Sequence, residues 1–241
     1  MPKVKYDTIY KNLKQKIETE EYSFQELLPS EHTLVLEYGC SRNTVRRAIA
    51  ELVKEGYVQS VQGKGVLNIF RPVEQSTFKM GSIESFKESA IRNHQEYFTN
   101  VVHFETIQAN QKIEKKTSFP QGTELIYIQR IHYFDGKPLI VNHNYFLKAL
   151  LPGLSKEIAQ HSIYEYIENT LGMVIVTSKR VMTVEKMNEI DMKYIDLKDY
   201  NCLAVVSSFT YNQEGVMFEY TQSRHHPDYF KFVDIATRRN G

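Results

Sequence analysis

The spacing of apolar residues divides the chain into two regions with different periodicity. Over the first 70 residues, apolar side chains recur every three or four positions, as they do on the packed face of a helix. One such stripe runs from Tyr6 to about Glu20. A second runs from Arg42 to Glu55, and its predicted apolar face is Val45, Ala48, Ile49 and Leu52. Beyond residue 80 the pattern changes to the two-residue alternation that is typical of β-strands. The sequence therefore predicts a helical N-terminal region followed by a sheet-rich region.

Serine and glycine residues predict where two short helices begin and end. Ser30 can accept hydrogen bonds from the free N–H groups of a helix start, and Gly39 suits the left-handed residue that ends a helix. Ser41 offers a second helix start only two residues later, and Gly56 marks the end of that second helix. Two short helices joined by a glycine-containing turn indicate a helix-turn-helix, whose second helix enters the major groove of DNA.

Positive charge gathers on the second of these helices. Arg42, Arg46 and Arg47 lie between Gly39 and Ala50, a stretch that contains no carboxylate. A guanidinium can bridge the O6 and N7 atoms of guanine, or it can bind a phosphate. Short polar side chains join the arginines in the first turn, at Ser41, Asn43 and Thr44. Taken alone, two arginines on one helix face more often indicate a solvated surface than a binding site.

A β-hairpin is predicted directly after the helices. Two strand-like runs, 57–61 and 66–70, flank the turn Gly63-Lys64-Gly65. The hairpin tip, which begins at Gln62, carries a cation on a backbone bare enough to approach a minor groove. Because a Gly-Lys-Gly turn alone is more often only a turn, the prediction of DNA binding depends on the order of the elements: helix cap, short helix, tight turn, arginine-bearing helix and basic hairpin.

The remainder of the chain predicts a separate domain of class α+β. Residues 72–80 lose the periodicity and carry a proline, so they are predicted to link domains at 1–71 and 81–241. Strands of a mainly antiparallel sheet are expected at 101–107, 124–134, 139–146, 173–184, 203–211, 216–224 and 230–235. Helices are expected at 82–93, 162–171 and 188–195.

One of these strands carries polar groups that share a face. Because alternate residues of a strand point the same way, Glu219, Thr221, Ser223 and His225 are expected on one surface. A carboxylate, two hydroxyls and an imidazole together suit the hydroxyl groups of a buried sugar, which need hydrogen-bond partners. The alternative interpretation is a strand that faces solvent.

Composition narrows the class of protein without naming a partner. Thirty Lys and Arg against 29 Asp and Glu give a net charge of +1. Any charged surface that binds a partner must therefore be a local cluster of residues. Two cysteines, Cys40 and Cys202, can form neither a disulfide framework nor a four-cysteine metal site, and no metal or cofactor is predicted. The chain has no signal-peptide pattern and no apolar run of about 18–20 residues. A cytoplasmic protein with no membrane partner is expected.

The N-terminal motifs together resemble the winged-helix signature of the GntR family of bacterial transcription regulators. The matching runs are Leu28-Pro29-Ser30-Glu31, Ser41 to Ala48, Glu55-Gly56-Tyr57-Val58 and Gly63-Lys64-Gly65. The resemblance implies a winged helix-turn-helix domain that binds DNA. The positions that it places on DNA are His32, Ser41, Arg42, Asn43, Thr44, Arg46, Arg47, Gln62, Gly63 and Lys64. The family often has arginine at the position of His32.

The C-terminal region resembles the UTRA effector-binding domain, which defines the HutC subfamily and is similar in fold to chorismate lyase. The matching runs are Arg130 to Pro138, Asn144-Tyr145-Phe146, Ser162 to Tyr166 and Glu219-Tyr220. The resemblance implies a site for a phosphorylated sugar, with a helix start at the phosphate. Its residues would be Ser85, Arg130, His132, Ser162, Tyr164, Glu219 and His225. The family often has arginine in place of His132 and an acid in place of Asn142.

The resemblance is greatest to a family member whose effector is trehalose 6-phosphate. It implies a homodimeric repressor that leaves a palindromic operator when the effector binds, with another sugar phosphate, such as an amino-sugar phosphate, as the alternative effector. Two other classes stay open. A lyase-like enzyme is one, although the Gly-x-Ser-x-Gly, His-Glu-x-x-His and phosphate-loop motifs do not occur. The other is an adaptor whose winged helix binds no DNA.

Overall fold

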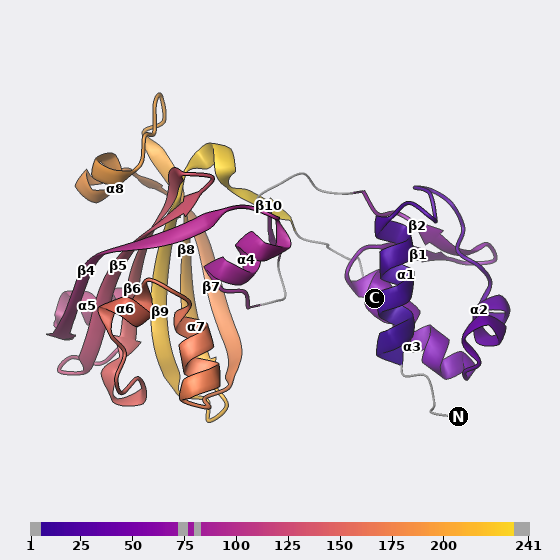
Figure 1. Cartoon of the computed structure of the whole chain (residues 1–241), viewed down its shortest axis with the longest axis horizontal. Helices are drawn as coiled ribbons and strands as arrows, with labels where there is room; N and C mark the ends of the chain where they lie inside the picture. Colours follow the sequence, from indigo (N-terminus) through magenta and orange to yellow (C-terminus); the bar gives the residue numbers. More distant parts are fainter. Residues whose placement is uncertain (1–5, 72–76, 80–82, 234–241) are drawn as a thin grey trace. The chain divides into compact units, whose positions relative to one another are not determined.

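The chain divides into two compact units, which a computed structural model describes over residues 6–71, 77–79 and 83–233 (Figure 1). Among the described residues, the first unit comprises 6–71 together with Val233, and the second comprises 77–79 and 83–232; they are called here the N-terminal unit and the C-terminal unit. The division falls inside the segment 72–80 that the sequence predicts as a linker, and the domain limits 1–71 and 81–241 stay predictions. In the parts of the chain that the structure describes, no helix is long and apolar enough to cross a membrane.

The N-terminal unit contains the three predicted helices and the predicted hairpin. Its elements are α1 (Tyr6–Glu18), α2 (Glu31–Tyr38), α3 (Arg42–Lys54), β1 (Val58–Val61) and β2 (Gly65–Asn68), with the two strands antiparallel. The second strand ends earlier than predicted, at Asn68 rather than Phe70. There the buried Asn68 amide donates hydrogen bonds to the carbonyls of Tyr22 and Ser23, at 2.7 and 3.0 Å, which ties the strand end to the loop after α1.

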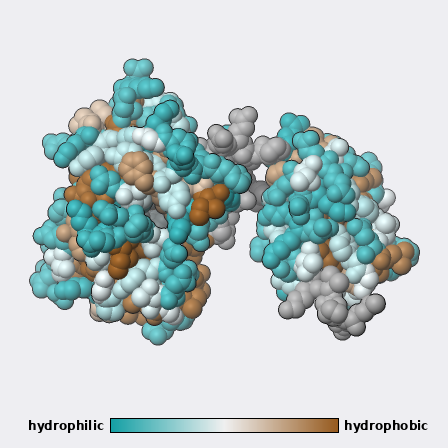
Figure 2. All heavy atoms as spheres, viewed as in Figure 1, coloured by the Kyte–Doolittle hydropathy of each residue, from teal (hydrophilic) through white to brown (hydrophobic). Residues whose placement is uncertain are grey.

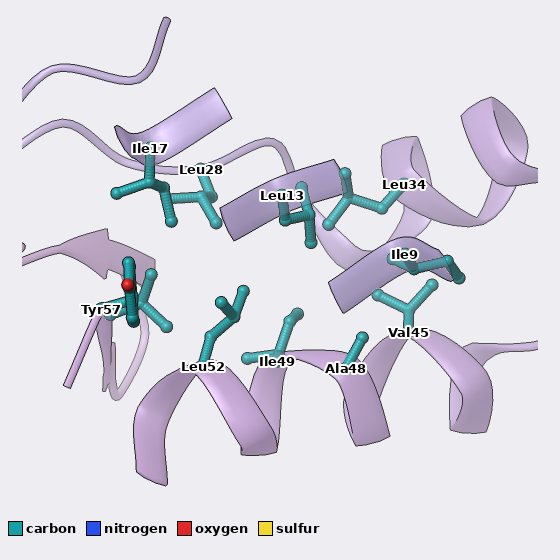
Figure 3. Packing of buried hydrophobic residues seen from close by; sticks show 11 residues of the cluster. Ile9, Leu13, Ile17, Leu28, Leu34, Val45, Ala48, Ile49, Leu52 and Tyr57 are labelled. Atoms are coloured by element: carbon teal, nitrogen blue, oxygen red, sulfur yellow. The ribbon is translucent and has the colours of Figure 1, made fainter. Parts of the chain in front are cut away.

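The apolar stripes of α1 and α3 meet in one core, as Figure 3 shows. Ile9, Leu13 and Ile17 of α1 are buried against α3. From α3 come the four residues of the predicted apolar face, Val45, Ala48, Ile49 and Leu52. The predicted apolar faces of both helices are therefore confirmed. On the surface in view in Figure 2, the N-terminal unit is mostly hydrophilic, in keeping with an apolar side turned inward.

Both predicted serine caps are present around the turn between α2 and α3. The Ser30 hydroxyl accepts from the Thr33 N–H at 3.1 Å, and the Ser41 hydroxyl accepts from the Thr44 N–H at 3.2 Å. Between them Gly39 has a φ of +58°, a left-handed conformation that a side chain would disfavour. Local hydrogen bonding and one glycine thus set the short turn of the helix-turn-helix.

Replacing Ser30 by alanine is expected to lower the free energy of unfolding of the N-terminal unit by about 1 kcal/mol, because the Thr33 N–H loses its acceptor. Denaturant unfolding followed by circular dichroism measures the change. Ser23→Ala is the matched control, since Ser23 makes its recorded hydrogen bonds through its backbone. Equal stability of the two variants would show that the cap contributes nothing.

The C-terminal unit is built on a six-stranded antiparallel sheet with the order β4-β5-β6-β9-β8-β7. Its strands are β4 (Tyr97–Gln108), β5 (Glu124–Phe134), β6 (Lys137–Leu147), β7 (Ile175–Lys186), β8 (Cys202–Asn212) and β9 (Met217–His225). The predicted α+β class and antiparallel sheet are confirmed. The fold differs at the predicted linker, where β3 (Thr77–Lys79) pairs with β10 (Lys231–Val233). Residues 77–79 of the predicted linker thus form a short strand, residues 72–76 and 80 lie outside the described part, and the linker at 72–80 stays a prediction.

Some helices of the C-terminal unit are shorter than the sequence predicts, and others were not predicted at all. They are α4 (Phe86–Arg92), α5 (Gln111–Thr117), η1 (Lys148–Leu150), α6 (Lys156–Ala159), α7 (Ile163–Glu165), η2 (Tyr166–Thr170), α8 (Glu189–Tyr194) and η3 (Pro227–Tyr229). The helix predicted at 82–93 begins only at Phe86, because Ser85 and Glu88 form a reciprocal capping box; residue 82 lies outside the described part. The prediction lacks α5 and α6, each too short to show an apolar stripe.

Helices cover both faces of the sheet. On one face, α4 packs over Phe134, Leu139 and Ile140, while α6 and α7 pack over Phe146 and its neighbours. Between these two apolar clusters the same face is polar. On the other face, α5 and α8 cover separate apolar clusters. The polar strip between α4 and α7 is therefore the place on the sheet where a polar ligand has room.

Candidate functional site

The N-terminal unit presents its predicted DNA-contacting residues at its surface. Thr44 is half-buried, and the others are exposed: His32, Ser41, Arg42, Asn43, Arg46, Arg47, Gln62, Gly63 and Lys64. At the hairpin tip Gly63 has a φ of +74°, and the Lys64 N–H donates to the Val61 carbonyl at 3.1 Å. This closed turn holds the Lys64 ammonium outward at the end of the hairpin.

The three arginines of α3 differ in their surroundings. Arg42 is exposed in the first turn of the helix. Arg46 donates through Nε to both carboxylate oxygens of Glu31, at 3.0 and 2.9 Å, and the guanidinium of Arg47 lies 3.8 Å from the ring centre of Tyr6. The stretch from Gly39 to Ala50 contains no carboxylate, and the one that pairs with Arg46 comes from Glu31 on α2. Because both partners are exposed, the Arg46 pair contributes little stability, and a DNA phosphate can replace Glu31.

A cavity of about 560 Å³ lies on the polar strip of the sheet in the C-terminal unit. All seven residues predicted for the effector site line it: Ser85, Arg130, His132, Ser162, Tyr164, Glu219 and His225. Ser85 and Ser162 are the N-caps of α4 and α7, so both helices begin at the cavity. The Lys87 ammonium and the Glu165 carboxylate, 2.7 Å apart, join these two helices.

A chain of hydrogen bonds crosses the floor of the cavity from a cation to a carboxylate. Arg130 donates through Nε to Asn144 Oδ1 at 2.9 Å, and Asn144 Nδ2 donates to Thr221 Oγ1 at 2.6 Å. The Thr221 hydroxyl donates to Glu219 Oε1 at 2.6 Å, and the Tyr164 hydroxyl donates to the other oxygen of Glu219 at 2.7 Å. The residues of this hydrogen-bond chain come from β5, β6, β9 and α7, so only the tertiary fold brings them together.

Burial shifts the pKa values of Glu219 and Arg130, the two charged groups joined by these hydrogen bonds. It raises the pKa of the Glu219 carboxyl above its ordinary value, against the lowering effect of hydrogen bonds from Thr221 and Tyr164 and of the Arg130 charge. Burial lowers the pKa of the Arg130 guanidinium to about 10, while the Glu219 charge acts in the opposite direction. Arg130 is therefore still a cation at neutral pH.

His132 lies in the cavity wall as a neutral imidazole. Its Nδ1 is 2.8 Å from Thr99 Oγ1, its Nε2 is 2.8 Å from Asn142 Nδ2, and its ring centre is 4.0 Å from that of Phe86. Burial lowers its pKa well below the ordinary value, and the nearby Arg130 adds to this effect. Burial also lowers the pKa of His225 to about 3. Arg130 and His132 both lie on β5, and at neutral pH only Arg130 carries a positive charge.

The polar face predicted for β9 is turned into the cavity. Glu219, Thr221 and His225 are 3%, 8% and 2% exposed, so the alternative of a solvent-facing strand is wrong. Thr221 and Ser223 line the cavity beside the predicted residues, as their alternation with Glu219 indicated. Three residues that line the cavity are missing from the site predicted from the sequence: Asn142, Asn144 and Arg180. Arg180 lies on β7, an edge strand. Only the order of the strands in the sheet shows that β7 borders the cavity.

A winged helix-turn-helix joined to a domain with a buried polar cavity is the architecture of a DNA-binding regulator that responds to a small molecule. Two family models match the chain: the gntR family of bacterial regulatory proteins over residues 5–67 and the UTRA domain over residues 92–231. The chain belongs to the GntR family of bacterial transcription regulators, in the HutC group that carries a UTRA domain. Regulators of this family bind operator DNA through the winged helix, and the effector domain implies a small-molecule ligand.

Similar proteins cover nearly the whole chain. The HTH-type transcriptional regulator TreR of Bacillus subtilis is 36% identical over 234 residues, which are 97% of this chain and 98% of TreR. The crystal structure of the possible regulator YydK of Bacillus subtilis matches 97% of this chain and 100% of its own with a TM-score of 0.78; at 22% identity it shows the fold alone. The effector-binding domain of the Bacillus subtilis trehalose repressor, TreR, covers 59% of this chain and 99% of its own, with a TM-score of 0.54 and 32% identity.

Proposed function

We propose that this protein is a transcriptional repressor that leaves its operator when trehalose 6-phosphate fills the cavity of the C-terminal unit. The observation that carries the proposal is the cavity itself, in which the half-buried Arg130 and the buried Glu219 are joined by hydrogen-bonding side chains. Its volume of about 560 Å³ lies within the range of about 300–1,000 Å³ that is typical of small-molecule sites. The 36% identity with a regulator that is named a trehalose repressor supports this effector.

Arg130 marks the phosphate end of the proposed complex, and Glu219 marks the sugar end. A guanidinium pairs with two phosphate oxygens at once, and it is the charged group best suited to a buried anion. The hydroxyls of Ser85 and Ser162 lie around the same cavity and supply further contacts to the phosphate. The Tyr164 hydroxyl donates to Glu219, so it must give up that hydrogen bond to donate to the phosphate. A buried carboxylate accepts hydrogen bonds from sugar hydroxyls, so Glu219 holds the sugar, while His225, six residues further along β9, lines the end of the cavity near His132. His132 lines the same cavity as a neutral imidazole, so it is proposed to meet the effector as a hydrogen-bond partner and not as a cation.

On the DNA side, the first turn of α3 is proposed to contact base edges and the hairpin tip to contact the adjacent minor groove. The contacting residues are those predicted: His32, Ser41, Arg42, Asn43, Thr44, Arg46, Arg47, Gln62, Gly63 and Lys64. A homodimer held through the sheet domain would place two such heads on half-sites about one helical turn, or roughly 34 Å, apart. An adaptor that binds no DNA is the alternative, and a gel shift on the upstream region of the gene separates the two.

An amino-sugar phosphate is the second candidate effector, because the buried Glu219 carboxylate is also a partner for an ammonium group. Titration calorimetry of the full-length protein against trehalose 6-phosphate, glucose 6-phosphate and glucosamine 6-phosphate ranks the candidates. Operator binding is then measured with and without the sugar phosphate that binds most tightly. A coupling of about 1–3 kcal/mol would weaken operator binding by roughly 5- to 150-fold. Equal operator affinity in both conditions rejects induction, and turnover of the sugar phosphate indicates an enzyme.

The affinity for trehalose 6-phosphate is expected to fall as the pH decreases from about 8 to about 5. Glu219 has a raised pKa, so it takes up a proton at a higher pH than an ordinary carboxyl and then accepts fewer hydrogen bonds from the sugar. The phosphate itself also gains a proton near its second pKa of about 6. His225 does not contribute, because its pKa of about 3 keeps it neutral over this range, and burial lowers the pKa of His132 as well. Calorimetric titration at a series of pH values measures the effect.

Glu219→Gln is the variant that separates these two contributions. It retains the shape of the side chain and removes the titrating carboxyl, so only the pH dependence of the phosphate should remain. Inorganic phosphate serves as the control ligand, and its pH dependence should be the same in both proteins. Identical pH curves of the two proteins with trehalose 6-phosphate would contradict a role for Glu219 in binding the sugar.

A further inference from the structure

Two short strands, β3 (Thr77–Lys79) and β10 (Lys231–Val233), form a two-stranded sheet apart from the six-stranded sheet of the C-terminal unit. They lie at the two places where the chain passes from one unit to the other. β3 is the first described element of the C-terminal unit, and the later division falls within β10, between Phe232 and Val233. Any change in this pair of strands therefore changes the connection between the two units.

β10 is also part of the cavity. Its central residue, Phe232, lines the cavity and is 40% exposed. The strand directly follows η3, which is fixed to the C-terminal unit at both ends. The His226 N–H donates to the Leu139 carbonyl at 2.9 Å, and Tyr229 packs against the apolar cluster below α4. A ligand that fills the cavity therefore covers the Phe232 ring, on a strand whose first residue is already held in place.

The pair of strands is too short to be strongly stable by itself. A two-stranded sheet is at best marginally stable in water, and three residues on each strand make few backbone hydrogen bonds. The balance between the paired and unpaired forms shifts as far as a ligand binds one form more tightly than the other. Covering the ring of Phe232 on a paired β10 removes apolar surface from water, so it favours the paired form.

Pairing of β3 limits the reach of the N-terminal unit. When β3 is paired, the five residues 72–76 connect it to residue 71, and they span at most about 18 Å. When β3 is unpaired, the thirteen residues 72–84 lead to the N-cap of α4 at Ser85, and they span at most about 47 Å. The longer connection gives each winged helix more freedom to reach half-sites about 34 Å apart.

We propose that the β3–β10 pair couples the cavity to the winged helix, and that the effector acts on the pair through Phe232. The effector covers the Phe232 ring and stabilises the pair, and the shortened connection draws the winged helices off their half-sites. The inference rests on the proposed function, since it assumes release of the operator by a sugar phosphate. It adds the element that carries the response and the residue that starts it.

Hydrogen exchange of the full-length protein tests the pair directly. The backbone amides of residues 77–79 are expected to exchange at least about tenfold more slowly with bound trehalose 6-phosphate, because stabilised pairing protects them. The amides of β1 in the N-terminal unit are the internal control, and their exchange should not change. Equal exchange of residues 77–79 with and without bound trehalose 6-phosphate would show that the proposal is wrong.

Phe232→Ala removes the ring and should uncouple the two functions. With saturating trehalose 6-phosphate its operator affinity should fall less than about twofold, against roughly 5- to 150-fold for the wild type. Without effector its operator affinity should equal that of the wild type or exceed it. Phe98→Ala is the matched control, since Phe98 also lines the cavity and is 52% exposed but lies on β4 of the six-stranded sheet. Phe98→Ala should respond as the wild type does, and Phe232→Tyr, which keeps the ring, should restore the response.

Phe78→Pro tests the other strand of the pair. Proline has no N–H to donate to a ladder and is found in strands only where that group is not needed. This variant should still bind trehalose 6-phosphate in calorimetric titration, but it should keep the operator when the effector is bound. Release of the operator by Phe78→Pro at the wild-type effector concentration would contradict a role for β3.

The results distinguish failure of this inference from failure of the proposed function. If the wild type binds none of the sugar phosphates, or keeps the operator with one bound, the proposed function fails and this inference fails with it. If the wild type releases the operator and both Phe232→Ala and Phe78→Pro do the same, only this inference fails. Equal loss of the response in Phe232→Ala and Phe98→Ala would mean that the shape of the cavity, and not β10, controls release.

Discussion

Arg130→Ala is expected to abolish the response to the phosphosugar while operator binding is retained. Arg130 is the cation at the head of the hydrogen-bond chain in the cavity, and with a pKa of about 10 it is charged at neutral pH. His132 and His225 are neutral there, so they cannot replace it. Removing one partner of a buried charge pair costs about 2–5 kcal/mol, or roughly 30- to 5,000-fold in the dissociation constant for trehalose 6-phosphate.

The measurement combines calorimetry with operator binding in the presence and absence of trehalose 6-phosphate. Lys115→Ala, on the exposed surface of α5, is the control for loss of a cation elsewhere in the C-terminal unit. Arg130→Lys, which keeps the charge but not the two-pronged guanidinium, should bind with intermediate affinity. If Arg130→Ala still released the operator at the wild-type effector concentration, the proposed phosphate site would be wrong.

Arg42→Ala is expected to weaken operator binding by about 1–3 kcal/mol, or roughly 5- to 150-fold, with phosphosugar binding unchanged. Arg42 lies in the first turn of α3, where a recognition helix approaches base edges, and its side chain is exposed. Arg46 and Arg47 already contact Glu31 and Tyr6, so each must give up a contact on binding DNA, whereas none is recorded for Arg42. For this reason the effect at Arg42 should be larger than at either neighbour.

Fluorescence anisotropy with operator and with scrambled duplexes measures the effect and its sequence dependence. Lys54→Ala is the matched control, since Lys54 lies on the same helix in its exposed last turn, away from the N-terminal end. Arg42→Ala should lose affinity for the operator more than for the scrambled duplex if the residue reads a base, and equally for both if it binds only phosphate. Unchanged operator affinity would contradict the placement of α3 on DNA.

The N-terminal unit could be predicted well because its determinants are local. A serine side chain caps the helix that directly follows it, and Gly39 ends α2 within the same short segment, so both are visible in a few consecutive residues. The apolar stripes of α1 and α3 show a period that only a packed helix requires. The ion pair between Arg46 and Glu31 could not be predicted in this way, because it forms only when α2 and α3 pack together.

The cavity could be predicted in part. The alternation along β9 placed Glu219, Thr221, Ser223 and His225 on one face, and all four line the cavity. Alternation does not reveal which face is buried, so the solvent-facing alternative stayed open until the positions of α4 and α7 were known. Short elements such as α5 and β3 left no periodic signal, since neither is long enough to show one. A strand was predicted where β10 lies, but its pairing with β3 could not be predicted from a local pattern.

Taken by itself, the sequence determined that this chain has a helix-turn-helix with a following hairpin and then a sheet-rich domain, because caps, glycines and apolar periods act over a few neighbouring residues. The resemblance of its motifs, not these local patterns, indicated that the second domain is of the UTRA type. Only the tertiary structure decided the electrostatics of the cavity. His132 is neutral because β4, β5 and β6 bring it into contact with Thr99 and Asn142 in a buried place. Contacts between residues far apart in sequence, and the loss of water around them, set those charges, and neither can be read from residue order.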